Sequence, residues 1–146
     1  MSDRFLAQMQ RLYALEVQSM HLLERQCDRV VDFGSLQARL RVHIAETKRQ
    51  LKRLAWNLNK YNRSPLQSEN QPSAASVREF ENDLVGSPLD KIILSQTAFE
   101  NLEIAEYNKL LEEASLAEDH EARSIFALSL EEERAMARVL ASELVA

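Results

Sequence analysis

Apolar residues recur every three or four positions in four long stretches of the chain, which is the spacing of one face of an α-helix. In the first stretch this apolar seam passes through Met9, Met20 and Leu23. Polar residues interrupt each stretch near its middle, and Glu16 is the interruption in the first. The pattern predicts an all-α protein with helices over residues 3–31, 36–60, 88–117 and 121–145.

Capping residues indicate where these helices begin. Ser2 and Ser35 stand where they can cap the first two helices, and residues 32–34 predict a tight turn between them. The third helix is expected to start at Ser87 followed by Pro88, a cap and then a proline at the first helical position. Because the turns are short, the first two helices and the last two should form antiparallel hairpins.

Between the second and third helices the pattern breaks over residues 62–87, which contain two prolines and several serines and asparagines. Within this connector the stretch from Val77 to Val85 predicts a short extra helix closed by Gly86. A bundle whose second and third helices run parallel needs a connection of this length, as in ferritin-like folds. We therefore expect one ferritin-like four-helix-bundle domain over residues 1–146, with a long crossover that carries a short helix.

Composition supports this fold and excludes several classes of function. The 146 residues include only 2 glycines and 3 prolines, as expected for long helices. No apolar run is long enough to span a bilayer, so no membrane association is expected. A net charge of −5 with mixed signs leaves no basic face for nucleic acid. The N-terminus shows no export signal and Cys27 is the single cysteine, which predicts a cytoplasmic protein.

Glutamates interrupt the predicted helices close to their midpoints. In chain order they are Glu16, Glu46, Glu100, Glu103 and Glu133. With a rise of about 1.5 Å per residue, each carboxylate is expected within roughly 3 Å of the mid-height of its helix. In an antiparallel bundle these side chains should therefore converge at one level of the core.

Several carboxylates at one buried level need protons, basic partners or metal ions to compensate their charge. Oxygen-rich sites suit iron or manganese, and bundle centres of this type combine a Glu from each of two helices with Glu-x-x-His from the other two. That histidine is missing here, because Arg49 follows Glu46 and Met136 follows Glu133 at the third position. His43, three residues before Glu46, is the nearest substitute. The interpretation is two iron or manganese ions, with a metal-free core as the alternative.

Other polar residues lie within reach of these glutamates. Tyr13 is three residues before Glu16, and Tyr107 is four residues after Glu103, so each tyrosine should reach its neighbouring carboxylate. Either they are core tyrosines that hydrogen-bond to a glutamate, or they are redox-active groups beside a metal. In a metal-free core the candidate counter-ions are Arg39, Arg49 and Arg53.

One group of residues in each predicted helix contributes to a combined pattern. The groups are Leu12-Tyr13-x-x-Glu16-x-Gln18, His43-x-x-Glu46-Thr47-x-x-Gln50-x-x-Arg53-Leu54, Gln96 with Glu100-x-x-Glu103-Ile104-Ala105-x-Tyr107, and Leu130-x-Glu132-Glu133. Together they resemble the YciF/YciE-type bacterial stress proteins, a ferritin-like family related to rubrerythrins. The resemblance covers nearly the whole chain. It implies a four-helix bundle, commonly a homodimer, with a di-metal site among the core glutamates and a role in stress response.

The chain departs from that family pattern in two helices. Where the family usually has Glu-His-Tyr-Glu in the third helix, this sequence reads Glu100-Asn101-Leu102-Glu103. In the fourth helix, Ala137 stands where an acidic residue is expected. These changes remove a nitrogen ligand and outer groups that would orient a metal.

Two kinds of function stay open at this point. The first is a di-iron or di-manganese carboxylate protein that oxidises Fe(II) or removes peroxide. Its primary ligands would be Glu16, Glu46, Glu103 and Glu133, with Glu100 as a bridging or outer ligand and His43 as an auxiliary one. The second is a metal-free ferritin-like scaffold, a dimer that acts through a protein partner. An iron-storage cage is disfavoured, because nothing in the sequence indicates a large assembly.

Overall fold

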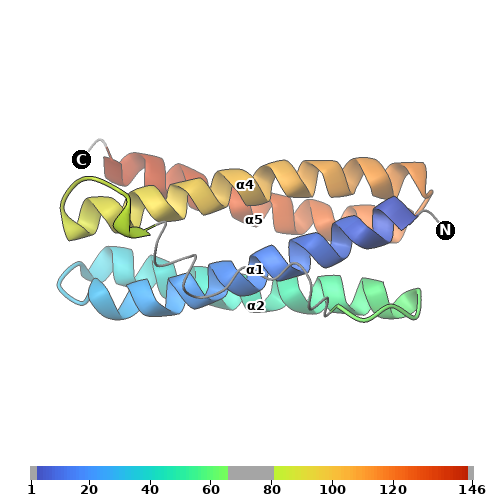
Figure 1. The fold of residues 1–146 in the computed structure, drawn as a ribbon, viewed down its shortest axis with the longest axis horizontal. Helices are drawn as coiled ribbons and strands as arrows, with labels where there is room; N and C mark the ends of the chain where they lie inside the picture. The colour runs from blue at the N-terminus through green and yellow to red at the C-terminus, as the bar shows by residue number, and fades with distance from the viewer. Residues whose placement is uncertain (1–2, 66–80, 145–146) are drawn as a thin grey trace.

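Four long helices make up the computed structural model, which describes residues 3–65 and 81–144. They are α1 (Asp3–Arg29), α2 (Gly34–Lys60), α4 (Pro88–Leu116) and α5 (His120–Leu144). Over these two ranges there is no strand, and no helix is long and apolar enough to cross a membrane. Figure 1 shows the four helices packed side by side, so the predicted all-α four-helix bundle is confirmed.

The helices α2 and α4 run in the same direction along the bundle. In Figure 1, α2 ends at the end of the bundle where the N-terminus lies, and α4 begins at the opposite end. Within each hairpin, α1 with α2 and α4 with α5, the two helices are antiparallel and joined by a short turn. The connection from Lys60 to Pro88 therefore has to span the length of the bundle, as the long connector predicted.

The start of α4 agrees with its prediction. The Ser87 hydroxyl accepts a hydrogen bond from the backbone N–H of Asp90 at 3.1 Å, and the Asp90 carboxylate accepts one from the backbone N–H of Ser87 at 3.2 Å. This reciprocal pair is a capping box, and Pro88 lies in the first turn. The start of α4 is therefore set by interactions among neighbouring residues.

The predicted cap of α2 is wrong. The helix begins at Gly34, and its N-cap is Phe33, which makes no side-chain capping hydrogen bond. The Phe33 carbonyl oxygen accepts from the backbone N–H of Gln37 at 2.9 Å, so the first helical turn already includes Ser35. The other predicted cap, Ser2, lies outside the described residues.

The short helix predicted over residues 77–85 ends earlier than expected. Residues up to 80 lie outside the described part of the chain. Glu81 and Asn82 are helical, but the chain then turns and is no longer helical at Val85. The Glu81 carboxylate is buried against α1, where it forms ion pairs with Arg25 at 2.9 Å and with Arg29. These ion pairs attach the end of the crossover to the first helix.

The core of the bundle consists of two apolar clusters with polar residues between them. The first cluster contains Phe5, Leu6, Met9, Leu12, Leu54, Leu58, Tyr107, Leu110, Ala114, Ala122, Phe126 and Leu130. The second contains Leu23, Cys27, Val30, Leu36, Leu40, Ile92, Ile93, Met136 and Leu140. Among the fully buried polar residues near the middle of the helices, we call Glu16, His43, Glu100, Glu103 and Glu133 the polar layer. Burying one large apolar side chain contributes about 1.5–3 kcal/mol, so the two clusters stabilise a bundle that also contains buried charge.

Candidate metal centre

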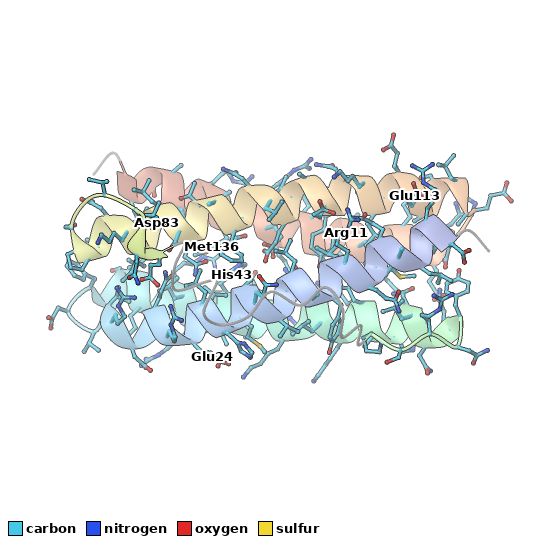
Figure 2. All side chains as sticks on the ribbon, viewed as in Figure 1. Arg11, Glu24, His43, Asp83, Glu113 and Met136 are labelled. Atoms are coloured by element: carbon cyan, nitrogen blue, oxygen red, sulfur yellow. The ribbon has the colours of Figure 1, made fainter. Side chains whose placement is uncertain are left out.

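Four side chains of the polar layer meet: His43 of α2, Glu100 and Glu103 of α4, and Glu133 of α5. One nitrogen or carboxylate oxygen from each of them lies within 4.8 Å of the chosen atoms of the other three. Glu100 and Glu103 share a face of α4 because they are three residues apart. Figure 2 shows His43 in the interior of the bundle, near the middle of its length. Four potential ligand atoms at this spacing could hold a metal ion.

Glu16 adds a side chain from α1 to the polar layer, so all four helices contribute to it. Its side chain is fully buried, and its charge interacts with those of Glu133 and Glu100. The structure thus brings together Glu16, Glu100, Glu103 and Glu133, which we call the core glutamates. Five glutamates were expected to converge because they lie near the mid-height of their helices, and these are four of them. Their roles as metal ligands stay predictions.

Seven of the eight carboxylate oxygens of the core glutamates have no hydrogen-bond partner among the described residues. The exception is Glu100 Oε1, which accepts from His43 Nε2 at 2.7 Å. An ionised carboxylate without a partner is costly to bury, and such a group takes up a proton or pairs with a cation instead. The core therefore needs protons or cations that its fixed donors do not supply.

In the metal-free protein, protons on the core glutamates compensate part of this charge. Burial, and after it the charges of neighbouring core glutamates, raise the pKa of Glu16 and Glu103 well above the ordinary value. The pKa of Glu100 is raised for the same reasons. Burial also raises the pKa of Glu133, but the neighbouring carboxyl groups of Glu103 and Glu100 and the charge of His43 outweigh it, so the pKa of Glu133 is lowered. Glu133 thus stays ionised while its neighbours carry protons.

His43 is the nitrogen donor of the cluster. Burial alone would lower the pKa of His43, but its hydrogen bonds to Glu100 and Glu46 raise the pKa to about 11. The ring of the metal-free protein is therefore an imidazolium that donates from Nε2 to Glu100 at 2.7 Å and from Nδ1 to Glu46 at 3.0 Å. To serve as a metal ligand, Nε2 would have to lose its proton.

Glu46 lies on the outer side of His43, away from the core glutamates. Its side chain is 13% exposed, and it accepts from Arg39 Nη1 at 3.2 Å as well as from His43 Nδ1. Burial raises the pKa of Glu46, but the bonds to His43 and Arg39 outweigh burial and lower it. In metal sites, a carboxylate on the second ring nitrogen fixes the tautomer and orientation of a histidine ligand. The position of Glu46 fits this orienting role better than that of a direct ligand.

A second hydrogen-bonded group connects α2 and α5. Glu132 accepts from Arg53 Nη1 at 2.6 Å and from Gln50 Nε2 at 3.2 Å, and Arg53 also donates to the Ser129 hydroxyl at 3.0 Å. Arg49 is 56% exposed and lies 3.9 Å from Glu132. Sequence reasoning missed Ser129, although it stands one helical turn before the predicted ligand of α5. Its position four residues before Glu133, on the same face of the helix, could have identified it in the sequence.

Tyr107 borders the core glutamates from α4. It is fully buried, and its hydroxyl has no hydrogen-bond partner among the described residues. Burial, and then the charges of Glu16 and Glu133, raise its pKa well above 10. No hydrogen bond joins it to Glu103, the neighbour expected from the sequence. Tyr13 is only partly buried and packs against the first apolar cluster.

The residues of this ligand group fit a metal ion. Glu100, Glu103 and Glu133 offer carboxylate oxygens, and His43 adds a nitrogen donor. A ligand set of carboxylates and one imidazole suits iron or manganese, whereas soft thiolate ligands select other metals. Cys27 is buried in the second apolar cluster and does not belong to the ligand group. The unpaired oxygens provide lone pairs that no other group engages.

Comparisons with known proteins extend over nearly the whole chain. The model of a family described as "Domain of unknown function (DUF892)" matches residues 1–145. The crystal structure of a protein from Xanthomonas campestris pv. campestris is similar, with a TM-score of 0.78 and 24% sequence identity. This match covers 96% of the present chain and 87% of that chain, and at this identity it establishes the fold alone. The ferritin-like character expected from the resemblance is confirmed, while the stress-response role and the homodimer stay predictions.

Proposed function

This chain belongs to the DUF892 family, and we propose that it is a ferritin-like carboxylate protein that binds two divalent iron or manganese ions in its polar layer. The observation that carries the proposal is the set of seven buried carboxylate oxygens without hydrogen-bond partners. Buried polar groups in native proteins are nearly always satisfied, so a concentration of exceptions at one level needs an explanation. Coordination of metal ions satisfies these oxygens and offsets their charge in one step.

The proposed ligand roles follow from the position of each side chain. Glu16, Glu103 and Glu133 would hold the ions through oxygens that no other group engages. Glu100 would contribute its unpaired oxygen, as a bridging or additional ligand. His43 would bind through Nε2, the nitrogen that lies against the core glutamates.

Glu46 and Arg39 would support the histidine rather than the metal. Because Glu46 accepts from Nδ1 of His43, that nitrogen keeps its proton and Nε2 is left for the ligand role. Arg39 in turn holds the Glu46 carboxylate in place. This arrangement supplies the outer-shell group that the sequence seemed to lack.

A pair of ferrous or manganous ions supplies electrons for reaction with dioxygen or hydrogen peroxide. We therefore propose Fe(II) oxidation or peroxide removal as the activity. The contribution of the protein is to exclude bulk water from the centre, since the core glutamates and His43 are fully buried. Tyr107 places a buried phenol beside Glu16, where it can donate a hydrogen bond to a ligand carboxylate after a small movement.

A metal-free scaffold is the second candidate, and one observation favours it. The His43 imidazolium, Glu46 and Arg39 form a hydrogen-bonded group with one surplus positive charge, which offsets one ionised core glutamate without any metal ion. With protons on Glu16 and Glu103, the remaining charge of the core would also be small. A protein of this kind would act through a partner and not through the chemistry of its core.

Metal content distinguishes the two candidates. We expect untagged protein, loaded anaerobically with Fe(II) or Mn(II), to hold two ions per chain by elemental analysis. Glu16→Gln and Glu103→Gln should each lose this metal, because an amide keeps the size of the side chain but not its charge. The matched control is Glu106→Gln: Glu106 is also a buried glutamate of α4, but its carboxylate is bonded to Gln8 at 2.5 Å and to Lys109 at 3.2 Å.

Metal loss in the two core variants, with full loading of the control, would support the carboxylate centre and justify oxidation assays. Wild-type protein that takes up neither ion would contradict the proposal and favour the scaffold. Circular dichroism of each variant excludes the trivial case in which a substitution prevents folding.

A further inference from the structure

A hollow of about 360 Å³ lies at the end of the bundle where α1 ends and α4 begins (Figure 1). Its charged lining residues are Arg25 and Arg29 of α1, Lys91 of α4, and Glu81 at the end of the crossover. Arg25 is nine residues after Glu16, which corresponds to roughly 14 Å along the helix at about 1.5 Å per residue. The hollow is therefore separate from the polar layer.

The lining of the hollow carries a surplus of positive charge. Three basic side chains and one carboxylate line it, which gives a net charge of +2 in a chain whose net charge is −5. One cation would be enough to compensate the buried carboxylate of Glu81, so that role does not account for all three. Asp90 precedes Lys91 in the chain, but its carboxylate accepts from the backbone N–H of Ser87 and does not line the hollow.

Glu81 holds the two arginines in position without using most of their donors. Its side chain is 6% exposed, and its two oxygens accept from Arg25 Nη2 at 2.9 Å and from Arg29 Nη1. Each guanidinium has five N–H donors, so both arginines keep donors for a further acceptor. The arginine side chains are 34% and 43% exposed, so a ligand can reach them from solvent.

Lys91 supplies a third cation, from the opposite wall of the hollow. It forms no ion pair with any residue that the structure describes, unlike the two arginines. Pro88, in the first turn of α4, also lines the hollow, so the positive end of the helix dipole lies beside Lys91. The charge of Lys91 is thus available to an anion that enters the hollow.

We propose that this hollow binds a dianionic phosphate group, supplied either by inorganic phosphate or by a small phosphate monoester. A phosphate group carries a charge of about −1.5 to −2 at neutral pH, which matches the surplus of the lining. The planar forks of two arginines suit its oxygens. Small-molecule pockets measure roughly 300–1,000 Å³, so the hollow has room for the organic part of a monoester. The site requires no metal ion and does not depend on the proposed function.

Calorimetric titration of the metal-free protein with inorganic phosphate tests the site. We expect one saturable site per chain in the wild type, and affinity roughly three- to tenfold weaker in Lys91→Gln. This variant leaves the bonds between Glu81 and the two arginines intact, so it tests binding without disturbing the fold. The matched control is Lys52→Gln, which loses the same charge from the exposed surface of α2 and should bind phosphate like the wild type.

Two results would overturn the proposal: no saturable binding at millimolar phosphate, or equal affinity in Lys91→Gln and the wild type. Acetate serves as a comparison anion, and acetate that binds as tightly as phosphate would contradict the assignment to a phosphate group.

Titration with glycerol phosphate distinguishes the two sources of the phosphate group. Tighter binding of the ester, with the same weakening in Lys91→Gln, identifies a monoester as the ligand, whereas tighter binding of inorganic phosphate identifies the free ion. Glu16→Gln, which should lose metal, should keep the phosphate affinity of the wild type. Loss of phosphate binding in Glu16→Gln that folds normally would place the anion in the polar layer and contradict the site.

Discussion

The two sides of the polar layer handle buried charge in different ways. On the side formed by α2 and α5, which we call the paired side, His43 is bonded to Glu46, and Glu132 accepts from an arginine and a glutamine. On the side formed by α1 and α4, which we call the unpaired side, neither oxygen of Glu16 or Glu103 has a partner. Glu46 and Glu132 are thus hydrogen-bonded on the paired side, where only Glu133 has unpaired carboxylate oxygens, whereas Glu16 and Glu103 on the unpaired side have no partner at all among the described residues.

This difference is what a metal-binding core requires. A ligand ring must be held in one orientation before the ion arrives, which is the contribution of the paired side. The oxygens that will bind the ion must not be engaged by other groups, and the unpaired side keeps them open at the expense of stability. Substitutions on the two sides should therefore change the stability of the metal-free protein in opposite directions.

The largest effect is expected for His43→Leu. Removing the imidazolium leaves Glu46 and Glu100 without the charge that compensates them, and breaking a buried ion pair in this way costs about 3–5 kcal/mol. Urea unfolding of chelator-treated protein measures the loss. The control is His21→Leu on exposed α1 surface, which should stay within about 0.5 kcal/mol of wild type. Equal stability of the two variants would show that His43 is not the main counter-charge.

Glu103→Leu is expected to stabilise the metal-free protein, which is the opposite of the effect expected for His43→Leu. Leucine removes a buried carboxyl whose oxygens have no donors, so the metal-free protein should gain about 1–3 kcal/mol in unfolding free energy. The same variant should bind no metal. In contrast, Glu106→Leu should lose stability, because it leaves Gln8 and Lys109 without their acceptor. Destabilisation by Glu103→Leu would mean that protons already satisfy the unpaired side.

The fold could be predicted from the sequence wherever its determinants are local. The helical period and the Ser87 cap followed by Pro88 depend on neighbours in the chain, and both were confirmed. The start of α2 was predicted wrongly because Ser35 looks like a cap, while the backbone turn at Phe33 begins the helix earlier. Which of two adjacent positions caps a helix depends on the turn geometry, and the sequence does not encode that geometry in a single residue type.

The candidate site could be predicted in part for a similar reason. The rise per residue fixes the height of a side chain in the bundle, which is why Glu16, Glu103 and Glu133 were correctly expected to converge. Height does not fix the rotation of a helix about its axis. Packing turns α2 so that His43 points into the core, while Glu46 lies on its flank next to solvent.

An intermediate effect on metal binding is expected for Glu46→Gln. If Glu46 orients His43, the variant should bind metal roughly 10–100-fold more weakly, equivalent to about 1.4–2.7 kcal/mol, and still reach full loading. Competition titration against a chelating dye measures the affinity. Glu131→Gln, a substitution at an exposed ion pair of α5, should leave it unchanged. Complete loss of metal would instead make Glu46 a direct ligand.

The smallest effect expected is the pH dependence of the stability of the metal-free protein. Because the pKa values of Glu16 and Glu103 lie well above 4.5 in the folded state, folding retains protons that the unfolded chain releases. The contribution of these two groups to the unfolding free energy is complete below pH 4.5 and is lost as the pH rises towards their pKa values in the folded protein. His43, with a pKa of about 11, stays charged through the neutral range.

Stability of the metal-free protein should therefore fall as the pH rises above about 4.5, by up to about 1.4 kcal/mol per pH unit for each group. The glutamine in Glu103→Gln has no proton to release, so this variant should lose less stability as the pH rises. Urea midpoints measured across the pH range test this. Saturating metal should reverse the sign, because the ions bind deprotonated carboxylates and bind them more tightly as the pH rises. A slope that is the same with and without metal would mean that the ions bind outside the unpaired side.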